Sequence, residues 1–327
     1  MRILVIGGAG YIGSHVVKSL LNTGFDVRVY DDLSTGKRIN LFKQAEFVEG
    51  SLLDMESLKK ALDNVDGVVH LAAKKAVGES MAEPEKYANN NLIGAINLLN
   101  AMTDKNVKYL VFSSSAAVYG MPQTPQLNES HPLNPINFYG FTKLEMERFM
   151  EWYDRLKGIK FVSLRYFNAV GYDEEGDILG LEEKPQNLLP VVMETLFGIR
   201  SQMSIFGNDY DTPDGTCIRD YIHVTDLATA HTLALQYLER ENTSQILNLG
   251  TGTGHSVLEM IQETERIVNQ KINYTMAPRR SGDPAKLTAS SEKAQSILGW
   301  QPKHSDLENI IRSTWHVYQN TYEKNQN

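Results

Sequence analysis

Near its start the chain reads Ile3-Leu4-Val5-Ile6-Gly7-Gly8-Ala9-Gly10-Tyr11-Ile12-Gly13-Ser14-His15. Four apolar residues predict a short buried strand, and glycines at every third position from Gly7 to Gly13 follow at once. Apolar positions with helical spacing then predict a helix as far as Asn22. Such glycines permit a tight turn, close approach of backbone N–H groups to a pyrophosphate, and close packing of helix on strand. We therefore expect a dinucleotide phosphate at this helix N-terminus.

The rest of the first half alternates between strand and helix patterns. Apolar runs predict strands at Asp26–Tyr30, Glu46–Val48, Gly67–Leu71, Lys108–Ser113 and Lys160–Tyr166. Helical patterns predict helices at Asp54–Leu62, at Ser80–Met102, opened by a capping box of Ser80 and Glu83, and at Tyr139–Leu156. This alternation is typical of a Rossmann-type α/β fold, in which a doubly wound parallel sheet carries helices on both faces.

The pattern loosens after Gly171, so we expect residues 1–171 to form the dinucleotide-binding domain and residues 172–327 a smaller α/β substrate domain. We expect a loop at Tyr172–Pro185, a helix from Leu188 to about Arg200, and short strands at Ser204–Phe206 and Tyr221–Val224. A helix at Thr225–Leu238, capped by Thr225 or Asp226, precedes a strand at Ile246–Leu249. Parts of residues 218–250 are expected to return to the main sheet, and the polar tail from Thr321 to fray.

Composition describes an ordinary globular protein, with 42% hydrophobic and 22% charged residues among 327. The net charge of −8 argues against nucleic acid or an anionic membrane as a partner. The lone Cys217 excludes an intramolecular disulfide and a cysteine-based metal cluster, and the histidines lack metal-ligand spacing, so no metal is expected. The first strand starts at Arg2 and no apolar run reaches membrane-spanning length, which predicts a cytoplasmic protein.

Acidic residues follow the second predicted strand, at Asp31 and Asp32. A carboxylate at this point of a dinucleotide-binding unit accepts hydrogen bonds from the adenosine ribose. The same carboxylate repels a 2′-phosphate, so the pattern favours NAD over NADP. Either residue could instead begin an ordinary turn.

A tyrosine and a lysine, Tyr139 and Lys143, are four residues apart and share one face of a predicted helix. A free phenol has a pKa of about 10, and a nearby ammonium or cationic nicotinamide would lower it toward the range of a general base. Ser115 follows a predicted strand at the carboxyl edge of the sheet, the usual ligand crevice, where its hydroxyl could bind the same substrate oxygen. These three side chains are the candidate catalytic residues.

Together the glycine turn, Ser113-Ser114-Ser115 and the Tyr-x-x-x-Lys pair resemble the extended short-chain dehydrogenase/reductase superfamily, and within it the UDP-glucose 4-epimerases. The resemblance spans nearly the whole chain. Its other segments are Lys75–Ser80, Leu164–Asn168, Ile205–Tyr210, Gly215–Val224 and Pro278–Asp283.

The resemblance implies NAD as cofactor and a UDP-hexose as substrate. It implies cofactor contacts at Gly7, Gly10, Tyr11, Ile12, Gly13, Asp31, Asp32, Ser51, Leu52, Leu71, Ala72, Lys75, Asn90, Tyr139, Lys143 and Phe167. It implies substrate contacts at Ser115, Tyr139, Asn168, Asn187, Leu188, Phe206, Arg219, Arg280, Asp283 and Leu287. Arginines suit a pyrophosphate because the guanidinium fork matches phosphate oxygens.

The implied reaction interconverts UDP-glucose and UDP-galactose in galactose metabolism. Tyr139 removes the 4-hydroxyl proton while the C4 hydride passes to NAD⁺, and the 4-keto sugar turns over before hydride returns to its other face. Two departures from the family pattern matter. Ser51 stands where relatives often carry an Asp toward the adenine, and Leu287 where they vary between Tyr and small residues.

Other readings remain open to different degrees. A sugar-nucleotide dehydratase or decarboxylase would need a carboxylate near Ala116 and Ala117, where this chain has none. The enzyme could act also or mainly on UDP-N-acetylglucosamine and UDP-N-acetylgalactosamine, depending on Leu287. From another class, the chain could be a non-catalytic NAD-binding regulator, although intact catalytic side chains argue against it. The resemblance also implies a homodimer formed through Glu83–Met102 and Phe138–Leu156.

Overall fold

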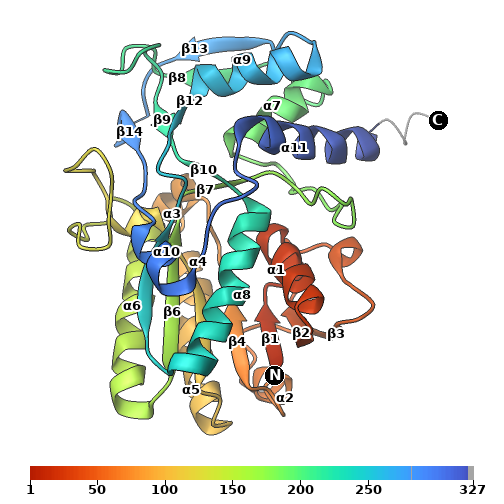
Figure 1. The fold of residues 1–327 in the computed structure, drawn as a ribbon, viewed down its shortest axis with the longest axis vertical. Helices are drawn as coiled ribbons and strands as arrows, with labels where there is room; N and C mark the ends of the chain where they lie inside the picture. The colour runs from red at the N-terminus through yellow and green to blue at the C-terminus, as the bar shows by residue number, and fades with distance from the viewer. Residues whose placement is uncertain (281, 323–327) are drawn as a thin grey trace.

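A seven-stranded parallel sheet lies at the centre of the computed structural model, which describes residues 1–280 and 282–322 (Figure 1). Its strands, in order across the sheet, are β11 (Gln245–Leu249), β6 (Lys160–Tyr166), β5 (Tyr109–Ser115), β4 (Gly67–His70), β1 (Arg2–Ile6), β2 (Asp26–Asp31) and β3 (Glu46–Glu49). Each strand pairs in parallel with its neighbours. The predicted Rossmann-type parallel sheet is confirmed.

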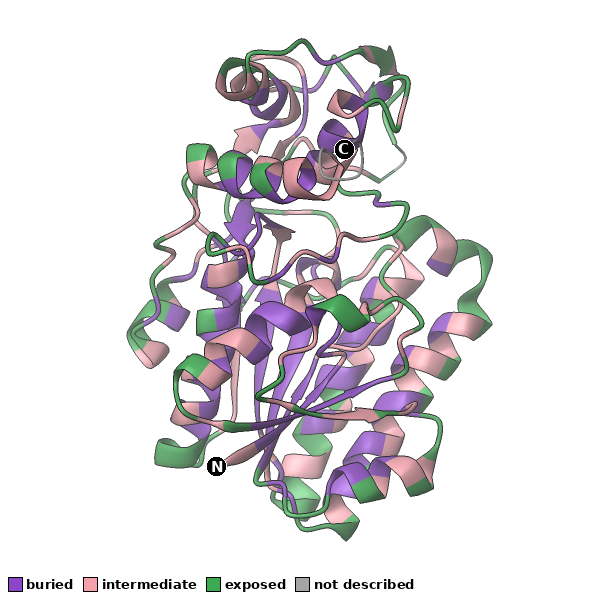
Figure 2. Cartoon of the chain, turned by 90° about the vertical axis from the view of Figure 1, so that its right-hand side faces the viewer, coloured by how far each residue is buried: buried purple, intermediate pink, exposed green. Residues whose placement is uncertain are grey.

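Helices cover both faces of this sheet. One face carries α1 (Tyr11–Asn22) packed against α8 (Val224–Glu241), with α10 (Glu292–Leu298) beside α8; the other carries α2 (Met55–Ala61), α5 (Gly94–Asp104) and α6 (Phe138–Lys157). The strands are buried between these layers, as the purple centre of Figure 2 shows. Two hydrophobic cores, one on each side of the sheet, therefore hold the strand ends in place.

The register of the strands brings their carboxyl ends to one edge. Ile6 pairs with His70, which in turn pairs with Phe112, and Ser115 pairs with Tyr166. The glycine turn after β1, the three serines that end β5, and the end of β6 consequently lie along the same edge of the sheet. This is the edge at which ligands bind in open parallel sheets.

A second group of elements lies beyond this edge, above the main sheet in Figure 1. Its strand pairs are β7 (Asn168–Val170) with β10 (Tyr221–His223) and β8 (Met203–Phe206) with β13 (Tyr274–Ala277), while β9 (Ile218–Arg219) lies between β12 (His255–Ser256) and β14 (Lys286–Leu287). Its helices are α7 (Leu188–Leu196), α9 (Val257–Val268) and α11 (Leu307–Tyr322). Strand β11 and helix α8 follow some of these elements in sequence yet belong to the main layer, and the boundary after Gly171 stays a prediction.

The predicted single helix over Ser80–Met102 is wrong. The chain instead forms α3 (Val77–Ala82), α4 (Pro84–Tyr87), a π-helical segment at Ala88–Ile93, and then α5. Pro84 lacks an N–H and cannot continue a preceding helix, and the backbone of Glu83 is non-helical, with φ −127° and ψ 59°. Ser80 is not a cap, since it lies inside α3 and its hydroxyl donates to the Val77 oxygen at 2.7 Å.

Two helix ends also differ from the prediction. Neither Thr225 nor Asp226 caps α8, because the His223 ring accepts the hydrogen bond from the Thr225 N–H at 3.1 Å. Helix α7 ends at Leu196, and Gly198, with φ +71°, turns the chain away. The expected fraying from Thr321 falls mostly outside the described residues, and α11 continues to Tyr322. Within residues 1–280 and 282–322, no helix is long and apolar enough to cross a membrane.

Candidate active site

The glycine turn brings strand β1, helix α1 and the end of β4 into contact. Gly7 has φ +82°, and a Cβ on it would lie 2.7 Å from the backbone nitrogen of Ala72. A Cβ on Gly13 would lie 2.0 Å from the carbonyl oxygen of Gly7. Side chains are thus excluded at both positions, and the backbone itself forms the wall of the site.

The N-terminus of α1 is not capped by a side chain. Gly10 occupies the N-cap position, it makes no side-chain hydrogen bond, and the first turn holds no acidic residue. The N–H groups of a first helical turn have no partners within the helix and, with the helix dipole, favour an anion. A pyrophosphate therefore fits this end of α1.

Asp31 connects the end of β2 to the glycine turn. Its carboxylate accepts hydrogen bonds from the N–H groups of Ala9, at 3.0 Å, and Leu33, at 2.9 Å. Burial raises the pKa of Asp31, while these two hydrogen bonds oppose that rise. Asp32 is exposed and accepts a 2.9 Å hydrogen bond from the Ser34 N–H.

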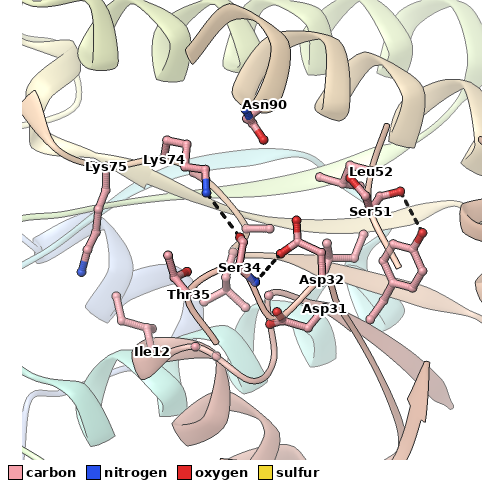
Figure 3. Close-up of a pocket in the computed structure, with 18 of the residues that line it drawn as sticks. Ile12, Asp31, Asp32, Ser34, Thr35, Ser51, Leu52, Lys74, Lys75 and Asn90 are labelled. Carbon is pink, nitrogen blue, oxygen red and sulfur yellow. Dashed lines mark hydrogen bonds between the residues drawn. The ribbon is translucent and has the colours of Figure 1, made fainter. Parts of the chain in front are cut away.

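A cleft runs over the turn, α1 and the ends of β2 and β4, with about 980 Å³ of empty space, counting the part open to solvent. In Figure 3, Asp31 and Asp32 lie on one side of this cleft and Asn90 on the opposite side. The predicted cofactor contacts that line the cleft are Gly7, Gly10, Tyr11, Ile12, Gly13, Asp31, Asp32, Ser51, Leu52, Leu71, Ala72, Lys75 and Asn90. The glycine wall, the uncapped helix and the carboxylates fit a dinucleotide.

Three of the predicted cofactor contacts, Tyr139, Lys143 and Phe167, do not line the cleft. Lys143 is connected to the cleft through a residue that does line it, and Tyr139 is close enough to that residue to influence the pKa of its phenol. The link is Tyr166, which lines the cleft and bonds through its hydroxyl to Ser113, the residue whose carbonyl oxygen Lys143 contacts. Phe167 packs instead with the apolar cluster around Leu144.

Sequence reasoning missed other lining residues, namely Ile6, Tyr30, Ser34, Thr35, Gly50, Leu53, Ala73, Lys74, Tyr166 and Glu182. Tyr166 could have been found, because it ends a predicted strand at the ligand-binding edge. Glu182 carries no such signal, since it reaches the cleft from an irregular loop. There its carboxylate pairs with the Lys75 ammonium, while Lys74 donates a 3.3 Å hydrogen bond to the Ser34 hydroxyl (Figure 3).

Helix α6 carries the candidate catalytic tyrosine in its first turn. The Asn137 side chain caps the helix by accepting a 2.8 Å hydrogen bond from the Gly140 N–H, and Gly158, with φ +68°, ends it. The N–H of Tyr139 donates to the Ser80 hydroxyl at 3.1 Å. These bonds fix the start of α6, and with it Tyr139, against helix α3.

The phenol of Tyr139 lies among groups that alter its acidity in opposite directions. Burial raises the pKa of Tyr139, and a hydrogen bond with the Ser115 hydroxyl lowers it. We expected the Lys143 ammonium and a cationic nicotinamide to lower this pKa. The amine nitrogen of Lys143 lies 5.8 Å from the centre of the Tyr139 ring, and the opposing effect comes from Ser115 instead.

Lys143 is itself buried, against the end of β5. Its amine donates a 2.7 Å hydrogen bond to the carbonyl oxygen of Ser113 and lies 4.8 Å from the centre of the Phe112 ring. Burial lowers the pKa of Lys143 to about 7, and the charge of Glu147 opposes this. The amine is consequently balanced between its charged and neutral forms near neutral pH.

Apart from Ser115 and Tyr139, the predicted substrate contacts lie among the elements beyond the sheet edge. Arg219 in β9 forms an ion pair with Asp283, and it lies opposite Leu287 in the pairing of β9 with β14. The Arg280 guanidinium lies 4.0 Å from the centre of the Phe206 ring at the end of β8. Two arginines, an aromatic ring and a carboxylate are groups that would suit a nucleoside diphosphate.

The other predicted substrate contacts lie on neighbouring segments. The side-chain amide of Asn168 donates a 3.0 Å hydrogen bond to the Asp220 carbonyl oxygen, next to Arg219. Asn187 and Leu188 begin helix α7, where Leu188 packs in the apolar clusters of that region. In the part of the chain that the structure describes, no hydrogen bond or ion pair joins these two residues to Arg219 or Arg280, and their role stays a prediction. Among the described residues, no group of three or more His, Cys, Asp or Glu could hold a metal ion.

Comparison with known proteins places the chain in a family. The model of the NAD dependent epimerase/dehydratase family matches residues 3–250. The chain therefore belongs to the NAD dependent epimerase/dehydratase family, which confirms the resemblance seen in its motifs.

Individual relatives are similar over nearly the full length. A curated UDP-glucose 4-epimerase of Streptococcus mutans serotype c is 48% identical over 99% of this chain and 98% of its own. The crystal structure of UDP-glucose 4-epimerase from Brucella ovis in complex with NAD has a TM-score of 0.95 at 41% identity, covering 97% of this chain and 98% of that one. The UDP-glucose 4-epimerase from Bifidobacterium longum, in complex with NAD⁺ and UDP, has a TM-score of 0.92 at 37% identity, covering 99% of each chain.

Proposed function

We propose that this enzyme interconverts UDP-glucose and UDP-galactose by epimerisation at sugar C4, with NAD as its resident cofactor. The observation that carries the proposal is the hydrogen bond of Tyr139 with Ser115, with the Lys143 amine 5.8 Å from the centre of the Tyr139 ring, near a cleft that fits a dinucleotide. Full-length similarity to relatives named UDP-glucose 4-epimerase supports the choice of substrate.

Residues of the cleft would hold NAD by its charged and polar parts. Its pyrophosphate would bind at the uncapped N-terminus of α1, next to Gly10, and its adenosine ribose near Asp31. Lys75 and Glu182 would border the cofactor from two separate loops. Bound there, NAD supplies a reversible acceptor for the hydride of sugar C4.

Tyr139 is the proposed general base and acid. Burial keeps the phenol neutral on its own, and the positive charge of bound NAD⁺ would favour its ionisation. The phenolate then takes the proton of the 4-hydroxyl group as C4 gives up its hydride, which leaves a 4-keto sugar. The Ser115 hydroxyl holds the same oxygen and lowers the pKa of Tyr139. A positive charge on Lys143, whose amine lies 5.8 Å from the centre of the ring, would favour the phenolate further. After the sugar turns over, C4 regains its hydride on the other face as the phenol returns the proton to the oxygen, so no net oxidation occurs.

This reaction requires the enzyme to bind UDP tightly and the hexose loosely, because the hexose must turn each of its two faces in succession toward the hydride acceptor. Arg219, Arg280 and Phe206 are the proposed nucleotide contacts, because two guanidinium groups and an aromatic ring suit a diphosphate and a base. Leu287 is proposed to border the hexose. Its apolar side chain makes no directional bond and would leave the sugar free to turn.

We also propose a cytoplasmic homodimer. Large apolar side chains are exposed on the helices expected to form the interface: Ile93 before α5, and Phe141, Trp152 and Leu156 on α6. Such side chains on neighbouring helices are typical of an interaction surface. Light scattering after size-exclusion chromatography would test the dimer, since a mass near 36.8 kDa would contradict it, and cell fractionation would test the location.

The proposed reaction is tested by incubating the purified protein with UDP-galactose carrying deuterium at C4. We expect UDP-glucose to form and to keep the deuterium at C4, because the hydride leaves and returns within one active site. Deuterium loss to solvent would contradict the hydride route, and absence of UDP-glucose would contradict the function. A parallel incubation with UDP-N-acetylgalactosamine measures the alternative substrate.

A further inference from the structure

The face of α6 that carries Tyr139 and Lys143 continues with Glu147, a buried carboxylate that the proposed reaction does not use. The three residues are spaced four apart, so they share one side of the helix. The end of β5 contacts this side repeatedly. The Lys143 amine donates to the Ser113 carbonyl oxygen at 2.7 Å, and Glu147 accepts a 2.6 Å hydrogen bond from the Ser114 hydroxyl.

Glu147 forms a buried ion pair with Arg165 of β6. Both side chains are only 2% exposed. One oxygen of Glu147 also accepts hydrogen bonds from the Ser163 hydroxyl, at 2.8 Å, and from Arg165 Nε, at 2.9 Å. The charge of the carboxylate is therefore fixed in a low-dielectric layer between α6 and the sheet, where charges act strongly on their neighbours.

The ion pair is anchored on its far side as well. Arg165 donates a 3.1 Å hydrogen bond to the Tyr119 hydroxyl, which donates at 2.5 Å to the side-chain oxygen of Asn248 in β11. Tyr119 follows the short 3₁₀ helix Ala116–Val118, whose N-cap is Ser115. The network thus reaches the strand end and the helix that together present the candidate catalytic side chains.

We propose that Glu147 is a positioning residue for the epimerase reaction, in which its carboxylate, held by Arg165 and Ser114, keeps the positive charge on Lys143 next to the reacting Tyr139. The role of this charge in turnover rests on the proposed function. The electrostatic coupling of Glu147 to Lys143 is independent of the reaction that the enzyme catalyses.

Among the described groups around Lys143, Glu147 is the one whose charge raises the pKa of the amine. From β4, His70 is neutral above pH 4, because burial lowers its pKa to about 3. From α6 and β6, burial raises the pKa of Tyr139 and of Tyr166, which keeps both phenols neutral near pH 7. Arg165 is cationic, and its guanidinium is paired with Glu147.

The inference predicts the direction in which the pKa of Lys143 moves when Glu147 loses its charge. In Glu147→Gln the amine loses a nearby carboxylate and faces an unpaired guanidinium, so the pKa of Lys143 should fall by about one unit or more. A merely structural role predicts the opposite. A loosened, wetter site would raise this pKa toward the ordinary value of a lysine.

The test is an NMR titration of NAD-loaded protein with ¹³Cε-labelled lysine, in which the Lys143 signal is assigned by its absence from Lys143→Arg. The matched control is Glu151→Gln, which removes the same charge from an exposed position one turn further along α6. We expect the control to leave the pKa of Lys143 within about 0.3 units of the wild type, because solvent screens an exposed charge. A pKa that is unchanged or raised in Glu147→Gln would overturn the proposal.

A double variant separates charge from packing. Adding Arg165→Met to Glu147→Gln removes the unpaired guanidinium, so the pKa of Lys143 should rise part of the way back, although the packing is disturbed further. No recovery would count against the proposal. If Glu147→Gln alone does not fold, the double variant is compared directly with wild type, and a pKa above that of wild type would overturn the proposal.

Turnover links the titration to the reaction. In Glu147→Gln, kcat/KM should begin to fall with rising pH about one pH unit earlier than in wild type, because the Lys143 amine loses its proton about one unit earlier. An unchanged pH profile would overturn the positioning role. Wild-type protein that shows the coupled titration but does not convert UDP-galactose would instead contradict the proposed function and leave the coupling standing.

Discussion

The Lys143 amine donates a 2.7 Å hydrogen bond to the carbonyl oxygen of Ser113, at the carboxyl end of β5. This contact holds a basic group inside the protein, against the face of an aromatic ring. Burial lowers the pKa of Lys143 to about 7, so below that pH the folded protein carries a buried charge. A group that serves catalysis in this way should reduce the stability of the fold.

The first prediction is that Lys143→Met stabilises the protein near neutral pH. Between pH 7 and the ordinary pKa of a lysine, the unfolded chain binds more protons than the folded one. The unfolding free energy of the wild type therefore rises by about 1.4 kcal/mol for each unit of increasing pH. The variant lacks this gain. The excess of its unfolding free energy over that of the wild type, measured with urea, should be largest at pH 6–7 and shrink toward pH 9. An excess that does not depend on pH would contradict this prediction.

The second prediction concerns the glycine turn. Gly13→Ala would place a methyl group 2.0 Å from the backbone oxygen of Gly7, so we expect it to cost about 1–3 kcal/mol of unfolding free energy and to weaken NAD binding. Gly78→Ala in helix α3 is the control, because nothing lies within 4 Å of the added atom. Thermal unfolding and NAD titration check both variants. Equal stability of the two would contradict the close packing described here.

The third prediction is that Ser51→Asp tightens NAD binding about threefold to tenfold. Ser51 lines the cleft, and a carboxylate there would accept a charge-assisted hydrogen bond from the adenine amino group, typically about 1 kcal/mol stronger than a neutral one. Ser51→Asn is the uncharged control and should bring no gain. Calorimetry on apoprotein checks this, and weaker binding by the Asp variant would refute it.

The fourth prediction is that Leu287 sets the range of sugars. Leu287 lies in β14 opposite Arg219 and packs, like Phe167, with the apolar cluster around Leu144. A clash with an acetamido group costs about 1–3 kcal/mol, or roughly tenfold to hundredfold in rate. Leu287→Ser should raise kcat/KM for UDP-N-acetylglucosamine more than for UDP-glucose, and Leu287→Tyr should do the reverse. An unchanged ratio in both variants would show that another residue limits the pocket.

Much of the fold and of the cofactor cleft follows from local sequence pattern. The alternation of apolar strands with helices predicts the parallel sheet, and the glycines from Gly7 to Gly13 locate the cleft because backbone geometry requires them. Tyr139 and Lys143 could be paired from their spacing alone. In each of these cases neighbouring residues in the sequence determine the structure.

Features that depend on distant segments could not be predicted. Ser80 matched a capping box, yet Pro84 interrupts the helix and the Ser80 hydroxyl instead accepts the N–H of Tyr139, 59 residues away. Glu182 reaches the cleft only through the tertiary path of its loop. The pKa of Lys143 reflects burial, which helix spacing does not reveal.

The most direct measurement of the central claim is the turnover of UDP-galactose by NAD-loaded Tyr139→Phe. Loss of the phenol should lower kcat by about 10²–10⁴-fold, the usual contribution of a general acid–base group, with NAD content unchanged. Tyr166→Phe is the matched control, since it removes another partly buried hydroxyl that lies at the cleft and bonds to Ser113, and it should stay within about tenfold of wild type. A Tyr139→Phe protein that retains NAD and turns over UDP-galactose within tenfold of wild type would contradict the account.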